Sequence, residues 1–361
     1  MTKVFFINSL SDGGAERVVL TLCKGFLKEN YNVHLILIYK SNANAYELPD
    51  DIIVHYLFED KPKDKVEKLL LLPKAVKKLK EVITKIEKDD KIDLFTSHLQ
   101  LSNYVAWLSK VKNHYGVIHS NYSKKYSGIM KIIISLILKS KKLIAVSEGV
   151  KDDLVRNFTL NKDNIVTIYN PFDINYIRQQ SIEKIEYEKP YIIHVGRLLK
   201  LKRQDLLINA YNQSDIKDKY NLIILGDGEE RNILKQQIKK LGIEQNVQLL
   251  GWQSNPYKWI KNASLFVLCS EYEGLPTVLI ESLICETAVI STNCKSGPSE
   301  ILIDDLSYYL VPVDDMIYLS KKIEEALDFY PKIEFKYYER FKIETIVSEY
   351  KKLGVKYEKT I

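Results

Sequence analysis

Short apolar runs alternate with amphipathic stretches along the whole chain, and this alternation is typical of parallel α/β sheets. In the first half, apolar runs predict strands at residues 4–7, 33–39, 52–57, 94–96, 115–118 and 143–146, with a helix at 16–28. In the second half, they predict strands at 191–195, 221–225, 247–250, 265–269 and 288–290. The predicted fold class is therefore α/β, with two Rossmann-like halves.

A charged segment at residues 181–189 separates these halves. It has no strand pattern and ends at Pro190, which favours a linker. A chain of 361 residues is long for one hydrophobic core and fits two domains. We therefore expect a first domain at 1–180, a second domain at 181–335, and an amphipathic C-terminal helix within 336–361.

Positive charge is concentrated in the first half. Residues 1–180 contain 28 Lys and Arg against 20 Asp and Glu, whereas residues 181–361 contain 25 against 27. Residues 94–147 include eight lysines and no acid. This asymmetry indicates an anionic partner for the first domain. The sequence contains no recognisable nucleic-acid-binding module, so we do not expect nucleic acid to be that partner.

The four cysteines are spaced neither like metal ligands nor like a disulfide framework, which fits a reducing compartment. The N-terminal segment lacks the pattern of a signal peptide. No apolar run approaches the roughly 18 residues needed to span a bilayer. These features together predict a cytoplasmic protein.

The segment 270–281, S-E-Y-E-G-L-P-T-V-L-I-E, has the richest candidate chemistry. It follows the strand predicted at 265–269, turns at Gly274 and Pro276, and then takes helical spacing. A helix N-terminus suits a phosphate, and the carboxylates Glu273 and Glu281 can accept hydrogen bonds from hydroxyls. The pattern predicts a ligand with both phosphate and polyol groups. An ordinary surface turn with two solvated glutamates is the alternative.

Three more loops follow predicted strands in the same way. Gly13 and Gly14 leave backbone N–H groups open to a ligand after the first strand. Arg197 and Lys202 follow the strand at 191–195, where a guanidinium and an ammonium could together neutralise a diphosphate. Gly226 lies in the turn after the next strand. The third glycine of a dinucleotide fingerprint is missing after Gly14, which disfavours an NAD-binding domain.

Two ring side chains also follow strands. His119 closes the strand at 115–118, at the end where open α/β sheets place ligand-binding groups. The alternative for His119 is a histidine with a purely structural role. The alternative for the loops at Gly13, Arg197 and Gly226 is an ordinary turn between a strand and a helix. Trp252 follows the strand at 247–250, and we expect it to be partly buried rather than stacked on a ligand.

The order and spacing of these motifs resemble the retaining glycosyltransferases of family 4. The matching segments are S-x-G-G-A-E-R-V-V at the first loop, G-R followed by K at the second, and E-x7-E. The resemblance implies the GT-B fold, with two Rossmann-like domains facing each other across a cleft and a C-terminal helix crossing back to the first domain. The segments N-P-Y-K and E-G-x-x-x-V-L-I-E-S-L are similar to bacterial enzymes that extend polyprenyl-diphosphate-linked glycans with an N-acetylhexosamine.

The resemblance also implies roles for the matching residues. Arg197 and Lys202 would clamp the diphosphate, while Glu273 and His119 would lie at the donor sugar; these four are the expected catalytic set. Glu281 would hold the ribose hydroxyls. The expected substrate-binding residues are Gly13, Gly14, Gly226, Gly274, Leu275, Pro276, Thr277, Val278 and Glu281.

The family likeness further implies a nucleotide-sugar donor, UDP-linked, and a lipid-linked glycan acceptor. We expect no metal or other cofactor, because no D-x-D motif stands in a loop after a strand. A sugar-nucleotide epimerase or a non-catalytic nucleotide-sugar-binding subunit with the same fold are the alternatives.

Residues 122–142 form an apolar stretch between lysine pairs, too short to cross a membrane. This pattern predicts an interfacial helix that docks the first domain on the anionic inner face of the cell membrane. The lysine-rich stretch 61–91 supports this interpretation. A buried core helix is the alternative.

Overall fold

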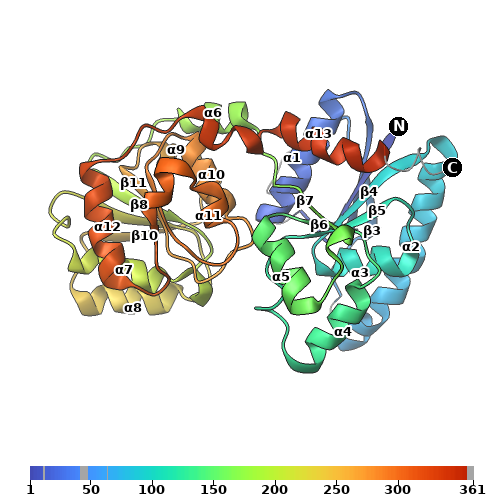
Figure 1. Ribbon diagram of the computed structural model, residues 1–361, viewed down its shortest axis with the longest axis horizontal. Coiled ribbons are helices and arrows are strands. Elements are labelled where there is room, and N and C mark those ends of the chain that lie inside the picture. The colour runs from blue at the N-terminus through green and yellow to red at the C-terminus, as the bar shows by residue number, and fades with distance from the viewer. Residues whose placement is uncertain (11–12, 41–47, 63, 356–361) are drawn as a thin grey trace. The chain divides into compact units, whose positions relative to one another are not determined.

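Seven parallel strands form the sheet of the first unit, which comprises Met1–Phe172 and the segment from Phe341 onward (Figure 1). The strands are β1 (Thr2–Ile7), β2 (Asn32–Tyr39), β3 (Ile53–Phe58), β4 (Ile92–His98), β5 (His114–Ile118), β6 (Leu143–Ala145) and β7 (Ile165–Thr167). Their order is β3-β2-β1-β4-β5-β6-β7, so the winding reverses between β1 and β4. This computed structural model describes residues 1–10, 13–40, 48–62 and 64–355.

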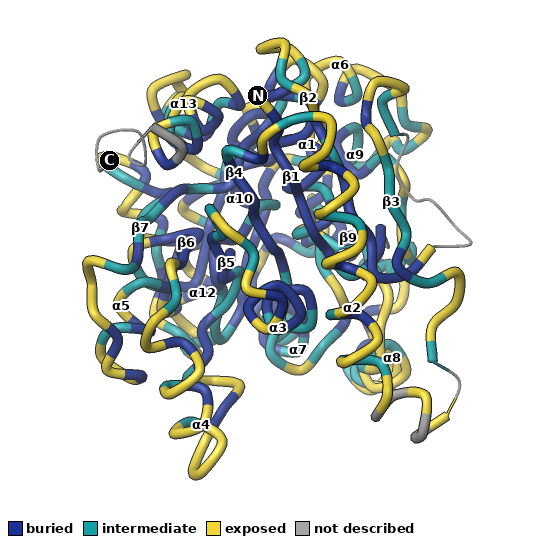
Figure 2. Tube along the Cα trace, turned by 90° about the vertical axis from the view of Figure 1, so that its right-hand side faces the viewer, coloured by how far each residue is buried: buried dark blue, intermediate teal, exposed yellow. Residues whose placement is uncertain are grey.

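Helices cover both faces of this sheet. Side chains of α2 (Lys65–Asp89) and α3 (Gln100–Ser109) pack on one face, in a cluster with apolar residues of β1, β2 and β4. On the other face α1 (Gly14–Lys28) brings Phe26 against Phe5 of β1, and α13 (Ile343–Val355) packs against α1 and β4. The helices α4 (Gly128–Leu138) and α5 (Glu148–Phe158) follow β5 and β6. Figure 2 shows most of the strands as buried, β3 as largely intermediate and α4 as largely exposed.

The second unit, Asp173–Arg340, has a parallel sheet of six strands in the order β10-β9-β8-β11-β12-β13. Its strands are β8 (Tyr191–Val195), β9 (Asn221–Leu225), β10 (Val247–Gly251), β11 (Leu265–Leu268), β12 (Val289–Thr292) and β13 (Leu310–Val311). Its helices are α6 (Ile174–Ser181), α7 (Gln204–Gln213), α8 (Arg231–Leu241), α9 (Tyr257–Lys261), α10 (Thr277–Ile284), α11 (Pro298–Ile301) and α12 (Met316–Asp328). Here the winding reverses between β8 and β11.

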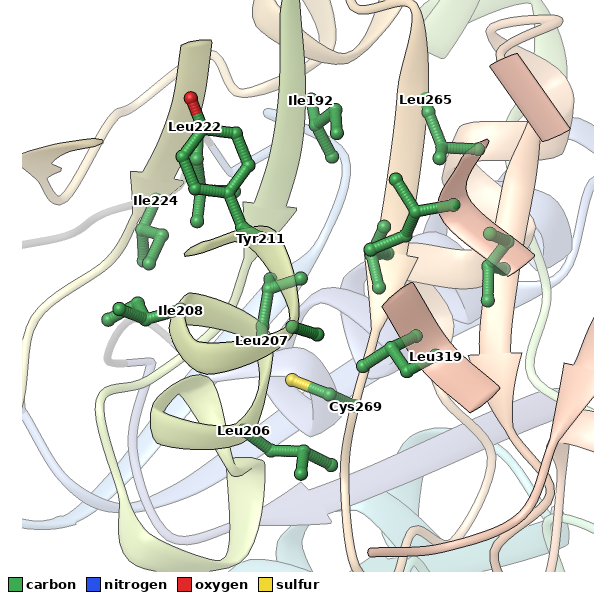
Figure 3. Packing of buried hydrophobic residues seen from close by; sticks show 14 of the residues in the cluster. Ile192, Leu206, Leu207, Ile208, Tyr211, Leu222, Ile224, Leu265, Cys269 and Leu319 are labelled. Carbon is green, nitrogen blue, oxygen red and sulfur yellow. The ribbon is translucent and has the colours of Figure 1, made fainter. Parts of the chain in front are cut away.

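The core of the second unit lies between one face of its sheet and the helices α7, α8 and α12. Figure 3 shows Leu207 and Tyr211 of α7 beside Ile192 and Leu222 of the sheet, all of them buried. The apolar side chains that fill this face therefore support β8 and β11, the strands that precede the candidate loops.

The chain leaves the first unit after Phe172 and returns to it at Phe341, and these two crossings are bonded to each other. The backbone N–H of Phe172 donates to the carbonyl of Phe341 (2.8 Å), and that of Ile343 donates to the carbonyl of Phe172 (3.1 Å). The sequence placed the boundary in the charged segment 181–189, several residues later. The difference arises because α6 belongs to the second unit, where Ile174 and Ile177 are buried against α9 and α10.

Both parallel α/β domains and the returning C-terminal helix are confirmed. Two strands were not predicted, β7 and β13, which have three and two residues. Runs of that length carry no readable periodicity. The predicted loop residues Ser11 and Asp12, part of the stretch 61–91, and the end of the tail lie outside the described residues.

The contact between α1 and α13 depends on the absence of a side chain at Gly25. A Cβ built there would stand 2.6 Å from Val347 Cγ2 and 2.9 Å from Ile343 Cγ1. We expect Gly25→Val to lower the free energy of unfolding of the first unit by about 1–3 kcal/mol, the usual cost of overpacking a core. Thermal unfolding of purified protein measures this.

Adding Val347→Ala to Gly25→Val should recover part of the lost stability, because it removes the methyl group that clashes most closely. Additive losses in the double variant would show that these two helices do not meet as described.

Candidate active site

The second unit brings two of its candidate loops together at the reversal of its sheet. β8 and β11 are neighbouring parallel strands there, pairing Leu265 with Ile192 and Phe266 with Ile193. Arg197 follows β8, and Glu273 follows β11. The crevice outside the carboxyl ends of strands at such a reversal is where open α/β sheets bind ligands. Topology therefore explains why residues far apart in sequence share one site.

A charge-assisted hydrogen bond links these two loops. Lys202 Nζ donates to Glu273 Oε1 at 2.5 Å, and both side chains are largely buried. Ser270 Oγ donates to the same oxygen at 2.6 Å. Within the described part of the chain, Glu273 Oε2 accepts no hydrogen bond. One carboxylate oxygen is thus fixed by protein, and the other remains to accept a hydrogen bond from a ligand hydroxyl.

The backbone of the same loops is bonded around this pair. The N–H of Glu271 donates to the carbonyl of Leu201 (2.8 Å), and Cys269 Sγ lies 3.1 Å from the carbonyl of Lys202. Thr292 Oγ1 of β12 donates to the carbonyl of Ser270 (2.6 Å). Backbone contacts therefore also join the loops that carry Lys202 and Glu273. The geometry of the pair does not depend on the ion pair alone.

Arg197 is exposed on the same loop as Lys202, and this loop is held through its backbone. Gln204 Nε2 donates to the carbonyl of Arg197 (3.0 Å), and the N–H of Leu199 donates to it as well (2.9 Å). Since Lys202 is paired with Glu273, the exposed cations of this loop are Arg197 and Lys200. By contrast, Arg203 forms ion pairs with Asp205 and Asp314, so its charge serves the fold.

Gly226 allows the loops after β8 and β9 to approach each other. Its φ is 128°, and a Cβ there would stand 2.0 Å from the carbonyl oxygen of Gly196. The N–H of Leu198 donates to the carbonyl of Asp227 across the same contact (2.9 Å). A glycine is therefore required here by backbone packing, whatever ligand the loop meets.

The turn of the motif leads into α10. Gly274, Leu275 and Pro276 are buried, whereas Thr277 and Val278 at the start of the helix are half-buried. Among the described residues no side chain caps this helix N-terminus, so its first N–H groups can bind an anion. Glu281 lies farther along α10 and is buried.

Gly297 packs closely on this turn from the next loop. Its φ is 94°, and a Cβ there would stand 2.4 Å from Pro276 Cδ. Glu300 Oε1 accepts from the N–H of Gly297 (3.3 Å). The loop after β12 therefore supports the turn that begins α10.

Sequence reasoning missed three residues that support this site, His194, Gln204 and Ser270. His194 is buried in β8, its Nδ1 lies 2.9 Å from the carbonyl of Val267, and its Nε2 lies 3.2 Å from Gln204 Nε2. Burial lowers the pKa of His194 to about 4, so the ring is neutral near pH 7. Nδ1–H then donates to Val267, and Nε2 accepts from the amide that also holds the Arg197 carbonyl.

A polar residue inside an otherwise apolar strand was the available signal for His194, and a serine opening the motif was the signal for Ser270. Trp252 requires a correction, because it was expected to be partly buried and is 54% exposed. It follows Gly251, whose φ is 79°, and this backbone conformation turns the chain outward after β10.

In the first unit, His119 follows β5 and is half-buried. Its Nε2 lies 3.0 Å from Nδ1 of His98, the last residue of β4. Gly13 precedes α1 and Gly14 begins it, and the buried Glu16 lies over Gly13, where a Cβ would stand 2.1 Å from Glu16 Oε2. A carboxylate so close disfavours a phosphate at Gly13.

Within the ranges that the structure describes, no three His, Cys, Asp or Glu side chains are grouped to hold a metal ion. The four cysteines are buried free thiols. Within the same ranges, no helix has the length and apolar character to cross a membrane.

Two family models match consecutive parts of the chain and together span residues 12–343. Residues 12–176 match the model described as Glycosyltransferase Family 4, and residues 176–343 match the one described as Glycosyl transferases group 1. Among curated proteins, an N-acetylgalactosamine-N,N'-diacetylbacillosaminyl-diphospho-undecaprenol 4-alpha-N-acetylgalactosaminyltransferase of Campylobacter jejuni is 36% identical over 322 residues, covering 86% of each chain. The chain belongs to glycosyltransferase family 4.

A second Campylobacter jejuni relative of this glycosyltransferase is 28% identical and covers 91% of the chain and 89% of its own length. It is a GalNAc-alpha-(1->4)-GalNAc-alpha-(1->3)-diNAcBac-PP-undecaprenol alpha-1,4-N-acetyl-D-galactosaminyltransferase. Solved structures share the fold. A Staphylococcus aureus TarM complex has a TM-score of 0.78 at 16% identity, covering 98% of this chain and 100% of its own. HepE from Anabaena with UDP-glucose has a TM-score of 0.74 at 19% identity, covering 97% and 98%.

Ser270 tests whether the glycosyltransferase depends on a fixed orientation of Glu273. Ser270→Ala removes one of the two donors to Glu273 Oε1, and we expect turnover to fall by about three- to tenfold, the effect of one lost hydrogen bond. Steady-state kinetics of sugar transfer measure this.

Ser282→Ala is the matched control, because Ser282 is buried in α10 and its hydroxyl donates to the carbonyl of Val278. Equal kinetics in the two variants would show that Ser270 has no special role.

Proposed function

We propose that this glycosyltransferase transfers an N-acetylhexosamine or hexose from a UDP-linked donor to a lipid-linked glycan, with retention of configuration and without a metal ion. The Lys202–Glu273–Ser270 cluster beside the N-terminus of α10 is the observation that carries this proposal. It combines fixed positive charge with a carboxylate oxygen open to a hydroxyl. The relatives that act on undecaprenol-linked glycans support the acceptor class, and the UDP-glucose complex of HepE supports the donor class.

In the proposed reaction, the bond between the anomeric carbon and the donor's diphosphate breaks, and the diphosphate departs with the electron pair. Arg197, Lys202 and the first N–H groups of α10 stabilise the departing charge, as prearranged donors do where charge develops. The acceptor hydroxyl attacks from the same face, and its proton passes to a departing phosphate oxygen. No covalent bond to the protein is needed.

The two carboxylates have separate roles in this proposal. Glu273 accepts hydrogen bonds from sugar hydroxyls through Oε2, because Oε1 is occupied by Lys202 and Ser270. Glu281 holds the ribose hydroxyls of the nucleotide. His119 and the loop at Gly13 and Gly14 lie in the first unit and serve the sugar and the acceptor.

Arg197→Ala tests the proposed leaving-group stabilisation. We expect turnover to fall on the order of 10²-fold or more, because an electrostatic stabiliser of the transition state is lost. Transfer of sugar from a radiolabelled UDP-N-acetylhexosamine to a polyprenyl-diphosphate glycan measures this, with and without EDTA.

Lys235→Ala in α8, which no described ion pair involves, is the matched control for loss of one surface charge. Undiminished turnover in Arg197→Ala would contradict the proposed role of Arg197 in stabilising the departing diphosphate. Complete loss of wild-type activity in EDTA, restored by Mg²⁺, would show that a metal stabilises the leaving group instead.

The alternatives give different products in the same assay. An epimerase would convert the donor to another nucleotide-sugar without an acceptor. A non-catalytic binding subunit would bind the donor and release no nucleotide, whether or not the lipid acceptor is present. Acceptor-dependent release of UDP distinguishes the proposed transferase from both.

We further propose that α4 docks the first unit on the inner, anionic face of the cell membrane. The exposed fractions of Ile129, Ile132 and Leu136 are 74%, 61% and 68%, whereas Ile134 and Leu138 are buried. The alternative of a buried core helix is therefore excluded for α4. The preceding Tyr122 and Tyr126 differ, since both are buried and pack edge to face at 5.3 Å.

Lysines lie within α4 and directly after it in the sequence. Lys131 lies within the helix, and Lys139, Lys141 and Lys142 follow it, in a stretch without acids. Each lysine near an anionic surface contributes about 1 kcal/mol of binding free energy. Combined with the apolar side chains, this charge gives reversible attachment that high salt weakens.

Changing Ile129, Ile132 and Leu136 together to Ser tests this docking. We expect binding to anionic liposomes to fall at least tenfold while the melting temperature stays unchanged, because all three side chains face solvent. Liposome co-sedimentation at low and high salt measures this.

Ile317→Ser with Phe329→Ser, at exposed positions of α12 and the residue after it, is the matched control. If both proteins bind liposomes equally, α4 is not the docking helix.

A further inference from the structure

Two histidines form a hydrogen-bonded pair at the carboxyl edge of the first sheet. His98 ends β4 and is fully buried, and His119 follows β5, the neighbouring strand. His98 Nδ1 lies 3.0 Å from His119 Nε2, and the ring centroids are 5.3 Å apart. On its other side, His98 Nε2 lies 3.1 Å from Thr96 Oγ1. The result is a line of three side chains, Thr96–His98–His119.

The backbone beside this line is strained. Leu99 follows His98 and has φ 68° and ψ 159°, a region that is essentially restricted to glycine. Such a conformation persists only where surrounding contacts hold it, and it is concentrated at functional sites. Here it turns the chain from the end of β4 into α3 while His98 stays beneath His119.

Both rings are neutral near pH 7. Burial lowers the pKa of His119 to about 4 and that of His98 well below its ordinary value. His114, the other histidine near the pair, is neutral as well, because burial lowers its pKa to about 3. It bonds Ser97 instead (2.7 Å), on the opposite face of β4. Each ring of the pair therefore has one N–H, and their shared hydrogen bond contains one of the two protons.

Two arrangements of these protons are conceivable. In the first, Thr96 donates to His98 Nε2, His98 Nδ1–H donates to His119 Nε2, and His119 has its proton on Nδ1. In the second, both hydrogen bonds reverse and His119 has its proton on Nε2, so the hydroxyl proton of Thr96 needs another acceptor. Within the described residues Thr96 Oγ1 has no hydrogen-bond partner except His98, and Thr96 is fully buried. A buried donor without an acceptor is unfavourable, so the first arrangement is favoured.

We propose that Thr96 and His98 are positioning residues that keep His119 in the Nδ1–H tautomer, so that His119 donates one uncharged hydrogen bond to an oxygen of the bound nucleotide-sugar. This rests on the proposed function, which places His119 at the donor. A neutral donor orients a sugar or phosphate oxygen without adding a charge that would also attract free phosphate.

Nitrogen-15 NMR of the histidine-labelled protein at pH 7 tests the tautomer directly. We expect the His119 signals, assigned by their loss in His119→Asn, to report a protonated Nδ1 and an unprotonated Nε2. In Thr96→Val the constraint on His98 is removed, and we expect the His119 signals to shift toward a mixture of tautomers. A wild-type His119 protonated on Nε2 would overturn the proposal.

Kinetics test the positioning role. His98→Leu leaves His119 Nε2 without a donor, and we expect turnover to fall on the order of tenfold, the value of one lost hydrogen bond. His98→Asn places an amide N–H where Nδ1 stood, so it should restore most of that turnover. His114→Leu, a buried histidine outside the line, is the control for loss of packing. Equal turnover in His98→Asn and His98→Leu would overturn the proposal.

Failure of the proposed function gives a different result. If the wild-type protein transfers no sugar, the proposed function fails, and the tautomer measurement still decides the arrangement of the three side chains. If the wild type transfers sugar while His98→Leu matches it, the positioning role alone fails. Thr96→Val supplies the same NMR readout if His98→Leu does not fold.

Discussion

The hydrogen-bonded ion pair between Lys202 and Glu273 is the interaction on which the arrangement of the second unit's site depends. It joins the loops after β8 and β11, which lie 71 residues apart in sequence. Removing one member would leave the other as a largely buried charge without its partner, which costs much more than the pair itself contributes. The pair also gives the two carboxylate oxygens different roles. Lys202 offsets the negative charge at Oε1, so Oε2 can accept a hydrogen bond from a hydroxyl close to a diphosphate without strong repulsion between the carboxylate and the diphosphate.

The two units carry different charged groups at the carboxyl edges of their sheets. The second unit gathers cations and a helix N-terminus and offsets part of that charge with Glu273. In the first unit, the corresponding edge of the sheet carries the neutral rings of His98 and His119, with a carboxylate at Glu16. Positive charge there lies instead on the lysines around α4. Under the proposed function, separate groups of residues would therefore bind the anionic nucleotide and the anionic membrane surface.

Much of the fold was predictable from the sequence. β8 and β9 have the predicted bounds, because each apolar run ends at a proline or glycine that breaks the strand. The site was predictable only as separate groups. Lys202 and Glu273 were each assigned to a ligand, and their contact with each other depends on the pairing of β8 with β11, which one sequence does not reveal. The line from Thr96 to His119 depends on the pairing of His98 with Val117 between β4 and β5, which one sequence does not reveal either. Ser270 could not be distinguished from an ordinary turn serine.

The return of the chain to the first unit at Phe341 has a consequence for the order of folding. The ribosome delivers α1 first and α13 last, with all of the second unit between them. The surface of α1 around Gly25, against which Ile343 and Val347 pack, therefore stays uncovered until α13 has been synthesised. We expect the second unit, whose sheet and helices are continuous in sequence, to fold during translation before the first unit is finished. A chain that ends near residue 340 would leave that surface of α1 exposed, so we expect such a truncation to destabilise the first unit although it contains all of the second unit.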